Sequence, residues 1–271
     1  MKGLRITSAL AFLYLFAGCG PKAPRAPSVP PVPAIPEKPV SAKELGLRMI
    51  RVEPGKFLMG SPPEEPWRSE DESLHENIIP HPFLLGSTEV TQAQYERLTG
   101  TNPSAFRGKD LPVENVSWNE AAAFCAKLTE NERRAGSLPE GMIYRLPTEA
   151  EWEFACRAGS SAAYSHGDAP ETLAEHAWHR GNSGNATHPV GSRKANALGF
   201  HDMHGNVWEW CADLYAKYGD QDGEKGSMRV RRGGSWNERP RNCRSAKRLW
   251  WLPDRRFDDL GFRVALGKPP E

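Results

Sequence analysis

The sequence predicts an α+β fold that is irregular and loop-rich, with few short helices and strands. The chain has 271 residues, of which 38% are hydrophobic, and this supplies enough apolar material for one sizeable core. Only three segments have clear helical features, and long stretches rich in Gly, Asn and Pro separate them. All nine tryptophans lie between Trp67 and Trp251, where large aromatic side chains can fix irregular backbone in place.

Helices and strands are expected at only a few places in the chain. The expected helices are Thr91–Thr99, Ser117–Arg134 and Thr148–Cys156. The second helix begins with the Ser-x-x-Glu capping box and the third with Thr-x-x-Glu. In the second helix, Ala121, Phe124, Cys125 and Leu128 follow the i, i+3, i+4, i+7 spacing of one buried face. The expected strands are Met49–Val52, Lys56–Met59, Phe83–Glu89, Arg229–Arg232 and Gly261–Leu266.

Residues 1–19 are interpreted as a lipoprotein signal peptide that ends at Cys19. Two basic residues precede the apolar run Ala9–Phe16, which is too short for the ~20 residues that span a bilayer. The segment Phe16-Ala17-Gly18-Cys19 resembles a bacterial lipoprotein box, in which the cysteine is lipidated. We therefore expect an exported protein anchored by lipid to a bacterial membrane, either the outer membrane facing the periplasm or the cell surface. The alternatives are an ordinary cleaved signal peptide or a buried apolar strand.

A Pro-rich linker is predicted over residues 20–44, before a folded domain at residues 45–268. Eight of the 20 residues from 21 to 40 are proline, which fixes φ and removes an amide donor, so the segment is expected to be an extended spacer. The whole chain has 35 Lys and Arg residues against 34 Asp and Glu residues. This balance argues against a nucleic acid as partner, because a nucleic-acid-binding protein needs a basic surface.

Eight spaced motifs occur along the domain in a fixed order. They are Pro54–Ser61, Glu89–Gln92, Asn102–Ser104, Pro112–Trp118, Tyr144–Glu153, Gly205–Trp210, Arg232–Trp236 and Leu260–Arg263. In this order the sequence resembles the formylglycine-generating enzyme, or sulfatase-modifying factor, family. The resemblance implies an irregular α+β fold related to C-type lectins, often with bound calcium.

A calcium site is implied by the resemblance of residues 202–209 to a metal-binding segment of that family. The implied ligands are the side chains of Asp202 and Glu209 and the main-chain carbonyls of Gly205 and Val207. Carboxylates mixed with carbonyl oxygens are the usual donors to Ca²⁺. The alternative is that Glu209 pairs with a nearby arginine while the neighbouring tryptophans fill the core.

The cysteines of the domain are expected to form one disulfide. By resemblance, Cys156 pairs with Cys243, and an exported protein meets conditions in which disulfides persist. The second disulfide of the family is missing, because Val264 stands where its second cysteine would be. Cys125 and Cys211 are then expected to be buried thiols, although a bond between them stays open.

The catalytic site of the family is where this sequence departs from the pattern. Formylglycine generators oxidise a substrate cysteine with O₂ at copper held by two thiolates, which suit soft Cu(I). The two cysteines lie at the third and eighth positions after the Gly-Gly-Ser serine, which here are Glu238 and Cys243. Copper is therefore not expected, and Cys243 is catalytic only in the alternative interpretation. Two histidine pairs, His176/His179 and His201/His204, are interpreted as loop residues rather than iron ligands.

A basic and aromatic surface is predicted around that position. Its candidate binding residues are Ser235, Trp236, Arg239, Arg241 and Arg244. Aromatic residues beside arginines favour peptide, acidic or carbohydrate ligands, whereas the alternative is that the tryptophans are core and the arginines pair with nearby aspartates. We expect a membrane-tethered module that binds a peptide or protein; the alternative is an oxidase that converts a sulfatase cysteine to formylglycine, or a related oxidoreductase.

Overall fold

The computed structural model describes residues 40–218 and 227–270. The predicted signal peptide, Cys19 and most of the predicted linker lie outside these residues. Within the described residues, no helix has the length and apolar character needed to cross a membrane.

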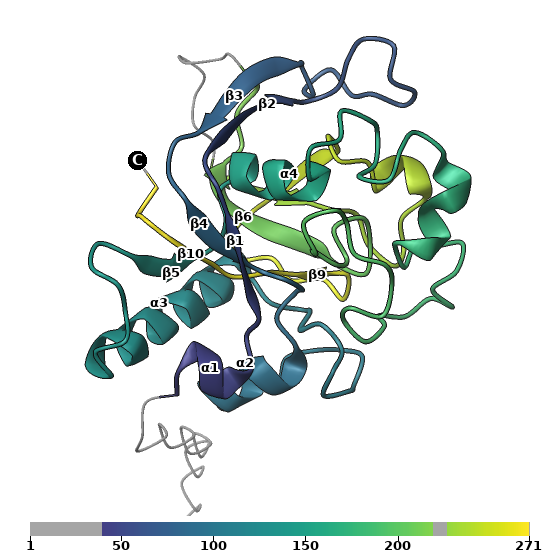
Figure 1. Cartoon of the computed structure of the whole chain (residues 1–271). Coiled ribbons are helices and arrows are strands. Elements are labelled where there is room, and N and C mark those ends of the chain that lie inside the picture. The colour runs from purple at the N-terminus through teal and green to yellow at the C-terminus, as the bar shows by residue number, and fades with distance from the viewer. Residues whose placement is uncertain (1–39, 219–226, 271) are drawn as a thin grey trace, which may run out of the picture. The chain divides into compact units, whose positions relative to one another are not determined.

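Two four-stranded sheets and one two-stranded ribbon form the β-structure (Figure 1). The first sheet is antiparallel, in the order β1 (Met49–Val52), β4 (Phe83–Gly86), β10 (Ala265–Gly267) and β5 (Ile143–Arg145). The second has the order β8 (Arg248–Trp251), β7 (Arg229–Arg232), β6 (Trp208–Leu214) and β9 (Leu260–Gly261), and only its β6–β9 pair is parallel. The ribbon pairs β2 (Gly55–Met59) with β3 (His75–Ile79).

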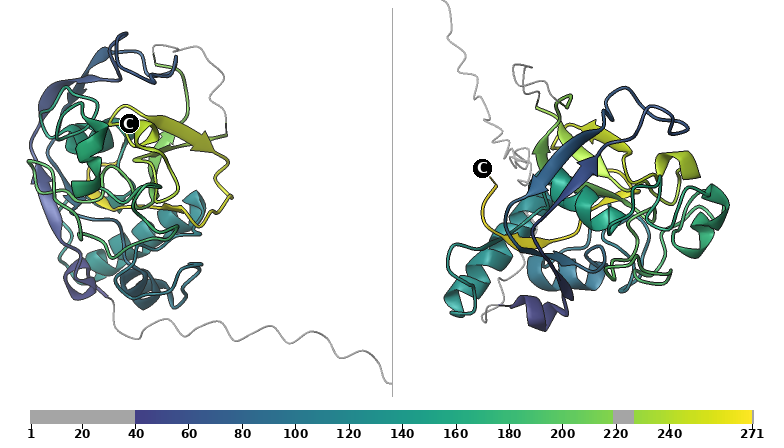
Figure 2. Two further views of the ribbon diagram at one scale, coloured as in Figure 1. Left: turned by 90° about the vertical axis from the view of Figure 1, so that its right-hand side faces the viewer. Right: turned by 45° about the horizontal axis from the view of Figure 1, so that its top comes forward.

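Four α-helices and two 3₁₀ turns complete the described fold. They are α1 (Ala42–Leu45), α2 (Gln92–Thr99), α3 (Trp118–Arg134), α4 (Glu149–Arg157), η1 (Pro170–Glu175) and η2 (Pro240–Asn242). The three predicted helices are confirmed, and their capping serine or threonine side chains accept the expected backbone hydrogen bonds. A long irregular stretch between α4 and β6 lies on the side of the domain away from α3 (Figures 1 and 2).

Two strand predictions differ from the structure. The strand expected over Phe83–Glu89 ends at Gly86, and the strand expected over Gly261–Leu266 is divided into β9 and β10. Strand β6 was not predicted, because its first four residues are all fully buried and give no alternation of polar and apolar side chains.

The folded domain begins before the predicted boundary at residue 45. Val40, Ala42 and Leu45 are buried in the core, and the amide of Ala42 donates to Glu132 Oε1 at 2.7 Å. Ser41 caps helix α1 with a capping box. The last residues of the predicted linker are therefore part of the fold, because they cover the end of the α3 face.

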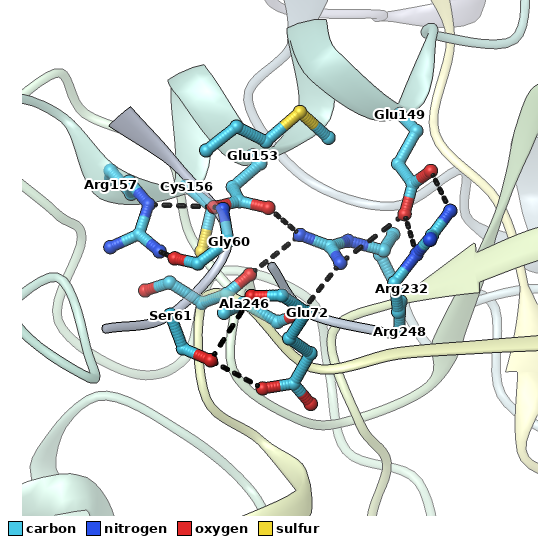
Figure 3. Close-up of polar contacts among 12 residues, drawn as sticks. Gly60, Ser61, Glu72, Glu149, Glu153, Cys156, Arg157, Arg232, Ala246 and Arg248 are labelled. Atoms are coloured by element: carbon cyan, nitrogen blue, oxygen red, sulfur yellow. Dashed lines mark hydrogen bonds and ion pairs between the residues drawn. The ribbon is translucent and has the colours of Figure 1, made fainter. Parts of the chain in front are cut away.

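Buried ion pairs connect α4 to the second sheet (Figure 3). Glu153 accepts from Arg157 Nε at 2.8 Å and also pairs with Arg232, and both of its partners are buried. Glu149 pairs with Arg248 at 2.6 Å and lies 3.4 Å from Arg232. The acidic residues of α4 therefore have structural roles, and the network holds the strand that leads into the Gly-Gly-Ser motif.

Candidate functional site

The Gly-Gly-Ser motif forms a tight corner directly after β7. Gly233 and Gly234 have φ values of 101° and 78°, which are strained for any residue with a side chain. A Cβ atom on Gly234 would also lie 2.6 Å from Cys243 Sγ. The corner turns Ser235 inward, where its hydroxyl donates to Asp259 Oδ2 at 2.9 Å.

Trp236 is the aromatic support of this corner. Its indole is only 8% exposed, donates to the carbonyl of Asp258 at 3.1 Å and packs edge-to-face on Phe106 with ring centroids 5.4 Å apart. Its amide donates to Asn206 O at 2.7 Å. Trp236 therefore matches the alternative interpretation, in which the tryptophan belongs to the core and positions the segment that follows.

The two positions that hold the catalytic cysteines in the family, here Glu238 and Cys243, offer no exposed thiol. Glu238 stands at the first position, and its Oε2 accepts from Asn242 Nδ2 at 2.6 Å. Cys243 stands at the second and is fully buried, with Sγ 3.7 Å from the carbonyl of Arg239. Burial raises the pKa of the Cys243 thiol, and the Glu238 charge raises it further, so the thiolate is disfavoured.

The predicted arginine cluster is divided by the structure. Arg239 and Arg241 are exposed, and neither has an ion-pair partner within the described residues. Arg244 is buried and pairs with Glu65 at 2.5 Å and with Glu72 at 2.8 Å. Arg244 is therefore a structural residue, and of the three arginines in the predicted cluster, Arg239 and Arg241 are the two whose guanidinium groups have no ion pair among the described residues.

The expected Cys156–Cys243 disulfide is not formed in the structure. All four cysteines of the domain are free and buried. The imidazole of His204 contacts both residues: its Nε2 lies 3.8 Å from Cys156 Sγ, and its Nδ1 lies 2.8 Å from the carbonyl of Cys243. Burial raises the pKa of the Cys156 thiol to about 12, so this thiol stays protonated beside the ring.

The two carboxylates among the four predicted calcium ligands, Asp202 and Glu209, are engaged to different extents by other groups of the domain. Both carboxylate oxygens of Glu209 accept from Arg263, each at 2.6 Å, and Trp152 Nε1 donates to one of them at 2.8 Å. Asp202 is buried, with Oδ2 bound to the amide of Gly191 at 2.7 Å and Oδ1 without a partner in the described structure. The geometry therefore matches the alternative arginine pairing of Glu209, and calcium binding stays a sequence-based prediction.

A third buried carboxylate, Glu89, lies near this pair and was given no role by sequence reasoning. It accepts from Asn206 Nδ2 at 3.0 Å and from the amide of Val207 at 3.2 Å. Burial, together with the charges of Asp202 and Glu209, raises its pKa well above the ordinary value. Glu89 and Arg263 both belong to the spaced motifs of the family, and this was the only feature of the sequence that pointed to a role for them.

The members of the two histidine pairs, His176/His179 and His201/His204, contact other residues rather than each other. His176 stacks on His166, with ring centroids 4.3 Å apart, and His201 Nδ1 lies 2.7 Å from the carbonyl of Arg193. Among the residues that the structure describes, no group of three or more His, Cys, Asp or Glu side chains is arranged to hold a metal ion. All four histidines lie outside the helices and strands, and their interpretation as loop residues rather than iron ligands stays a prediction.

A cavity of about 520 Å³ lies beside the β2–β3 ribbon, and Arg244 from the segment after the Gly-Gly-Ser corner forms part of its wall. Its lining includes Leu58, Trp67, Leu74, Arg157, Tyr164 and Arg244. This cavity was not predicted from the sequence, because its walls come from four separate segments.

The chain is an irregular α+β domain in which a buried Gly-Gly-Ser turn follows strand β7. A family model, the sulfatase-modifying factor enzyme 1-like domain, matches residues 36–268. The chain belongs to this family.

Similar proteins include members with different printed functions. The chain is 31% identical over 202 residues to the "Chaperone protein LppX" of Paenibacillus barcinonensis, covering 59% of this chain and 71% of that protein. It is 33% identical to the "Inactive C-alpha-formylglycine-generating enzyme 2" of Bos taurus over 69% of this chain and 61% of the relative. It is 30% identical to the formylglycine-generating enzyme of Mus musculus over 73% of this chain. The chain spans 54% of the mouse enzyme, so it matches less than two thirds of either mammalian relative.

Two solved structures share the fold across most of the domain. Treponema denticola variable protein 1 superposes with a TM-score of 0.71 at 31% identity, covering 80% of this chain and 94% of that one. PvdO from Pseudomonas aeruginosa superposes with a TM-score of 0.70 at 32% identity, covering 80% and 93%. The predicted fold class and family are thereby confirmed.

Proposed function

We propose that this protein is a non-catalytic member of the sulfatase-modifying factor family that binds a peptide or protein segment at a bacterial membrane. The observation that supports this most directly is the chemistry at the catalytic positions. Glu238 cannot replace a thiolate toward Cu(I), and Cys243 is buried beneath the corner. Two converging thiolates are therefore lacking at the place where the family's oxidation chemistry requires them.

The corner retains features suited to binding. Ser235 and Trp236 are fixed by hydrogen bonds to the Asp258–Asp259 segment, so the backbone that follows is held in place. Arg239 and Arg241 project from this rigid support with free guanidinium groups. Planar guanidinium groups suit carboxylate ligands, so an acidic peptide segment is the ligand that this corner favours.

The relatives are consistent with this proposal without deciding it. One is named as an inactive formylglycine-generating enzyme and another as a chaperone protein. The family fold is therefore found in proteins whose names do not describe an oxidase.

An aldehyde assay tests the catalytic part of the proposal. The full-length protein is incubated with Cu(I), O₂ and a Cys-x-Pro-x-Arg peptide, and the peptide mass is followed. We expect no conversion of cysteine to formylglycine, while a copper-loaded formylglycine-generating enzyme serves as the positive control. Aldehyde formation that is lost in Cys243→Ser would overturn the proposal in favour of the oxidase.

Membrane attachment requires its own experiment. Expression in a bacterial host with labelled palmitate should label the wild-type chain, and Cys19→Ala should remove both the label and the protein from the membrane fraction. Protease treatment of intact cells distinguishes the cell surface from the periplasmic face. An unlabelled wild-type chain in the soluble fraction would contradict the lipid anchor.

A further inference from the structure

We propose that the cavity beside the β2–β3 ribbon binds a cationic side chain, Lys or Arg, that neighbours an apolar residue in a peptide. This inference rests on the proposed binding function, but it assigns a second site with the opposite charge preference to the Arg239–Arg241 corner. The loop that joins β2 to β3, residues 60–74, is called the hairpin loop below. It stands out from the domain in both views of Figure 2.

The outer wall of the cavity is apolar and exposed. Leu58 is 52% exposed, Trp67 is 55% exposed and Leu74 is 40% exposed, and all three line the cavity. Ile78 lies on the same exposed face of the ribbon as Leu58, because the two residues are offset by two positions in the strand register. Large apolar side chains gathered on one hairpin indicate a surface that contacts another molecule.

The backbone holds the indole of Trp67 at the mouth of the cavity. Trp67 has a φ of 62°, which is a strained backbone conformation for a bulky residue. The carbonyl of Trp67 accepts from Arg244 Nη2 at 2.9 Å, and this contact with a buried guanidinium fixes the unusual conformation. The contact uses only the main chain, so the exposed indole is left free to meet a ligand.

The two arginines that line the cavity are already committed to other groups. Arg157 donates to Glu153, to the carbonyl of Gly60 at 2.6 Å and to the carbonyl of Ala162 at 3.2 Å. Arg244 donates to Glu65, to Glu72 and to two main-chain carbonyls. The five printed contacts of Arg244 use all of its N–H groups, and Arg157 is neutralised by its buried ion pair with Glu153, so the charges of both arginines are already balanced inside the domain.

The exposed charges of the lining are negative. Glu64 and Asp168 are both exposed, and neither forms an ion pair in the described part of the chain. Asp168 accepts one backbone hydrogen bond, from Ala163 at 2.9 Å, and keeps its second oxygen available. The hairpin loop adds the exposed Glu70, while its single basic residue, Arg68, donates to the carbonyl of Ser61 at 3.1 Å.

Charge and aromatic character together define the ligand. A Lys or Arg head group over the face of Trp67 gains a cation–π contact, and Glu64 and Asp168 supply the counter-charge. A neighbouring apolar side chain would cover Leu58 and Leu74. The cavity volume of about 520 Å³ lies within the range of small ligand sites, roughly 300–1,000 Å³, and accommodates such a side chain with part of its flanking residue.

Calorimetry with matched peptides tests the inference on the full-length protein. The probes are the blocked tetrapeptides Leu-Arg-Pro-Leu, Leu-Gln-Pro-Leu and Leu-Glu-Pro-Leu. We expect the Arg peptide to bind at least about fivefold more tightly than the Gln peptide, and the Glu peptide to bind most weakly at this site. Trp67→Ala should weaken the Arg peptide by about fivefold to tenfold, and the double variant Glu64→Gln/Asp168→Asn should remove most of the preference for Arg over Gln.

The matched control is the double variant Arg239→Ala/Arg241→Ala, which should leave binding of the Arg peptide unchanged. Circular dichroism of Trp67→Ala should match the wild type, since the altered side chain is exposed. Equal binding of the three peptides, no binding of the Arg peptide, or indifference to Trp67→Ala would each overturn this site. The Arg239/Arg241 corner is judged separately, because it would still bind the Glu peptide and lose it only in the arginine double variant.

Discussion

Removing the charge of Glu153 should destabilise the domain more than any exposed ion-pair change. Glu153 is fully buried, accepts from the amide of Gly60 at 2.9 Å and pairs with both Arg157 and Arg232. In Glu153→Gln, Arg157 would lose its ion-pair partner, and Arg232 would keep only Glu149, which already pairs with Arg248 (Figure 3). Breaking one partner of a buried ion pair typically costs about 3–5 kcal/mol, because an uncompensated charge stays in the core.

Urea unfolding monitored by circular dichroism measures this change directly. For a domain of this size, a loss of about 3–5 kcal/mol corresponds to a decrease in Tm of roughly 6–20 °C. Glu130→Gln is the matched control, since Glu130 pairs with Arg133 and Arg134 at the exposed end of α3, and its loss should cost under about 0.5 kcal/mol. A cost below about 1 kcal/mol for Glu153→Gln would refute the idea that this network holds α4 on the second sheet.

Three further predictions concern titration, metal and thiols. Burial raises the pKa of Glu114 from 4.5 to about 7. Its contribution to the free energy of unfolding is therefore present below pH 4.5 and decreases as the pH rises toward 7, by at most about 1.4 kcal/mol per pH unit. Glu114→Gln should remove this slope from a series of urea titrations, and an unchanged slope would contradict the assignment. The calcium site implied by the resemblance is tested with EDTA. With Glu209 paired to Arg263 as in the structure, EDTA should change the Tm by less than about 1 °C, and a larger decrease would support calcium binding. Thiol titration of the unfolded, unreduced protein should find Cys156 and Cys243 free, whereas recovery of a peptide linking them would restore the predicted disulfide.

Local signals in the sequence were sufficient for the helices. The capping residues Ser117 and Thr148 specify where α3 and α4 begin, because a side-chain oxygen satisfies an amide that the helix leaves open. Strand β6 gave no comparable signal, since Trp208, Glu209 and Trp210 are all fully buried. A charged residue within a buried strand is understood only when its partner is known, and that partner, Arg263, lies 54 positions away.

The candidate sites likewise combine features that the local sequence predicts with features that depend on distant residues. The corner after β7 was located by counting from Ser235, but the counting could not separate the exposed Arg239 from the buried Arg244. That distinction depends on Glu65 and Glu72 in the hairpin loop, which lie 179 and 172 positions from Arg244. Long-range ion pairs of this kind leave no periodicity or spacing in the sequence.

The ion pairs of Arg244 also connect the two proposed binding surfaces. Its guanidinium group binds the hairpin loop through Glu65, Glu72 and the carbonyl of Trp67, while its own main chain follows the corner that carries Arg239. Removing Arg244 would leave the buried Glu65 without an ion pair, leave Glu72 with only the Lys247 ion pair at 3.8 Å, and release the contact that fixes the backbone of Trp67. Cation binding in the cavity beside the hairpin loop therefore depends on Arg244, which comes from the same segment as Arg239 and Arg241. The cavity and the Arg239/Arg241 corner are held in place by the same buried ion pairs, although they favour ligands of opposite charge.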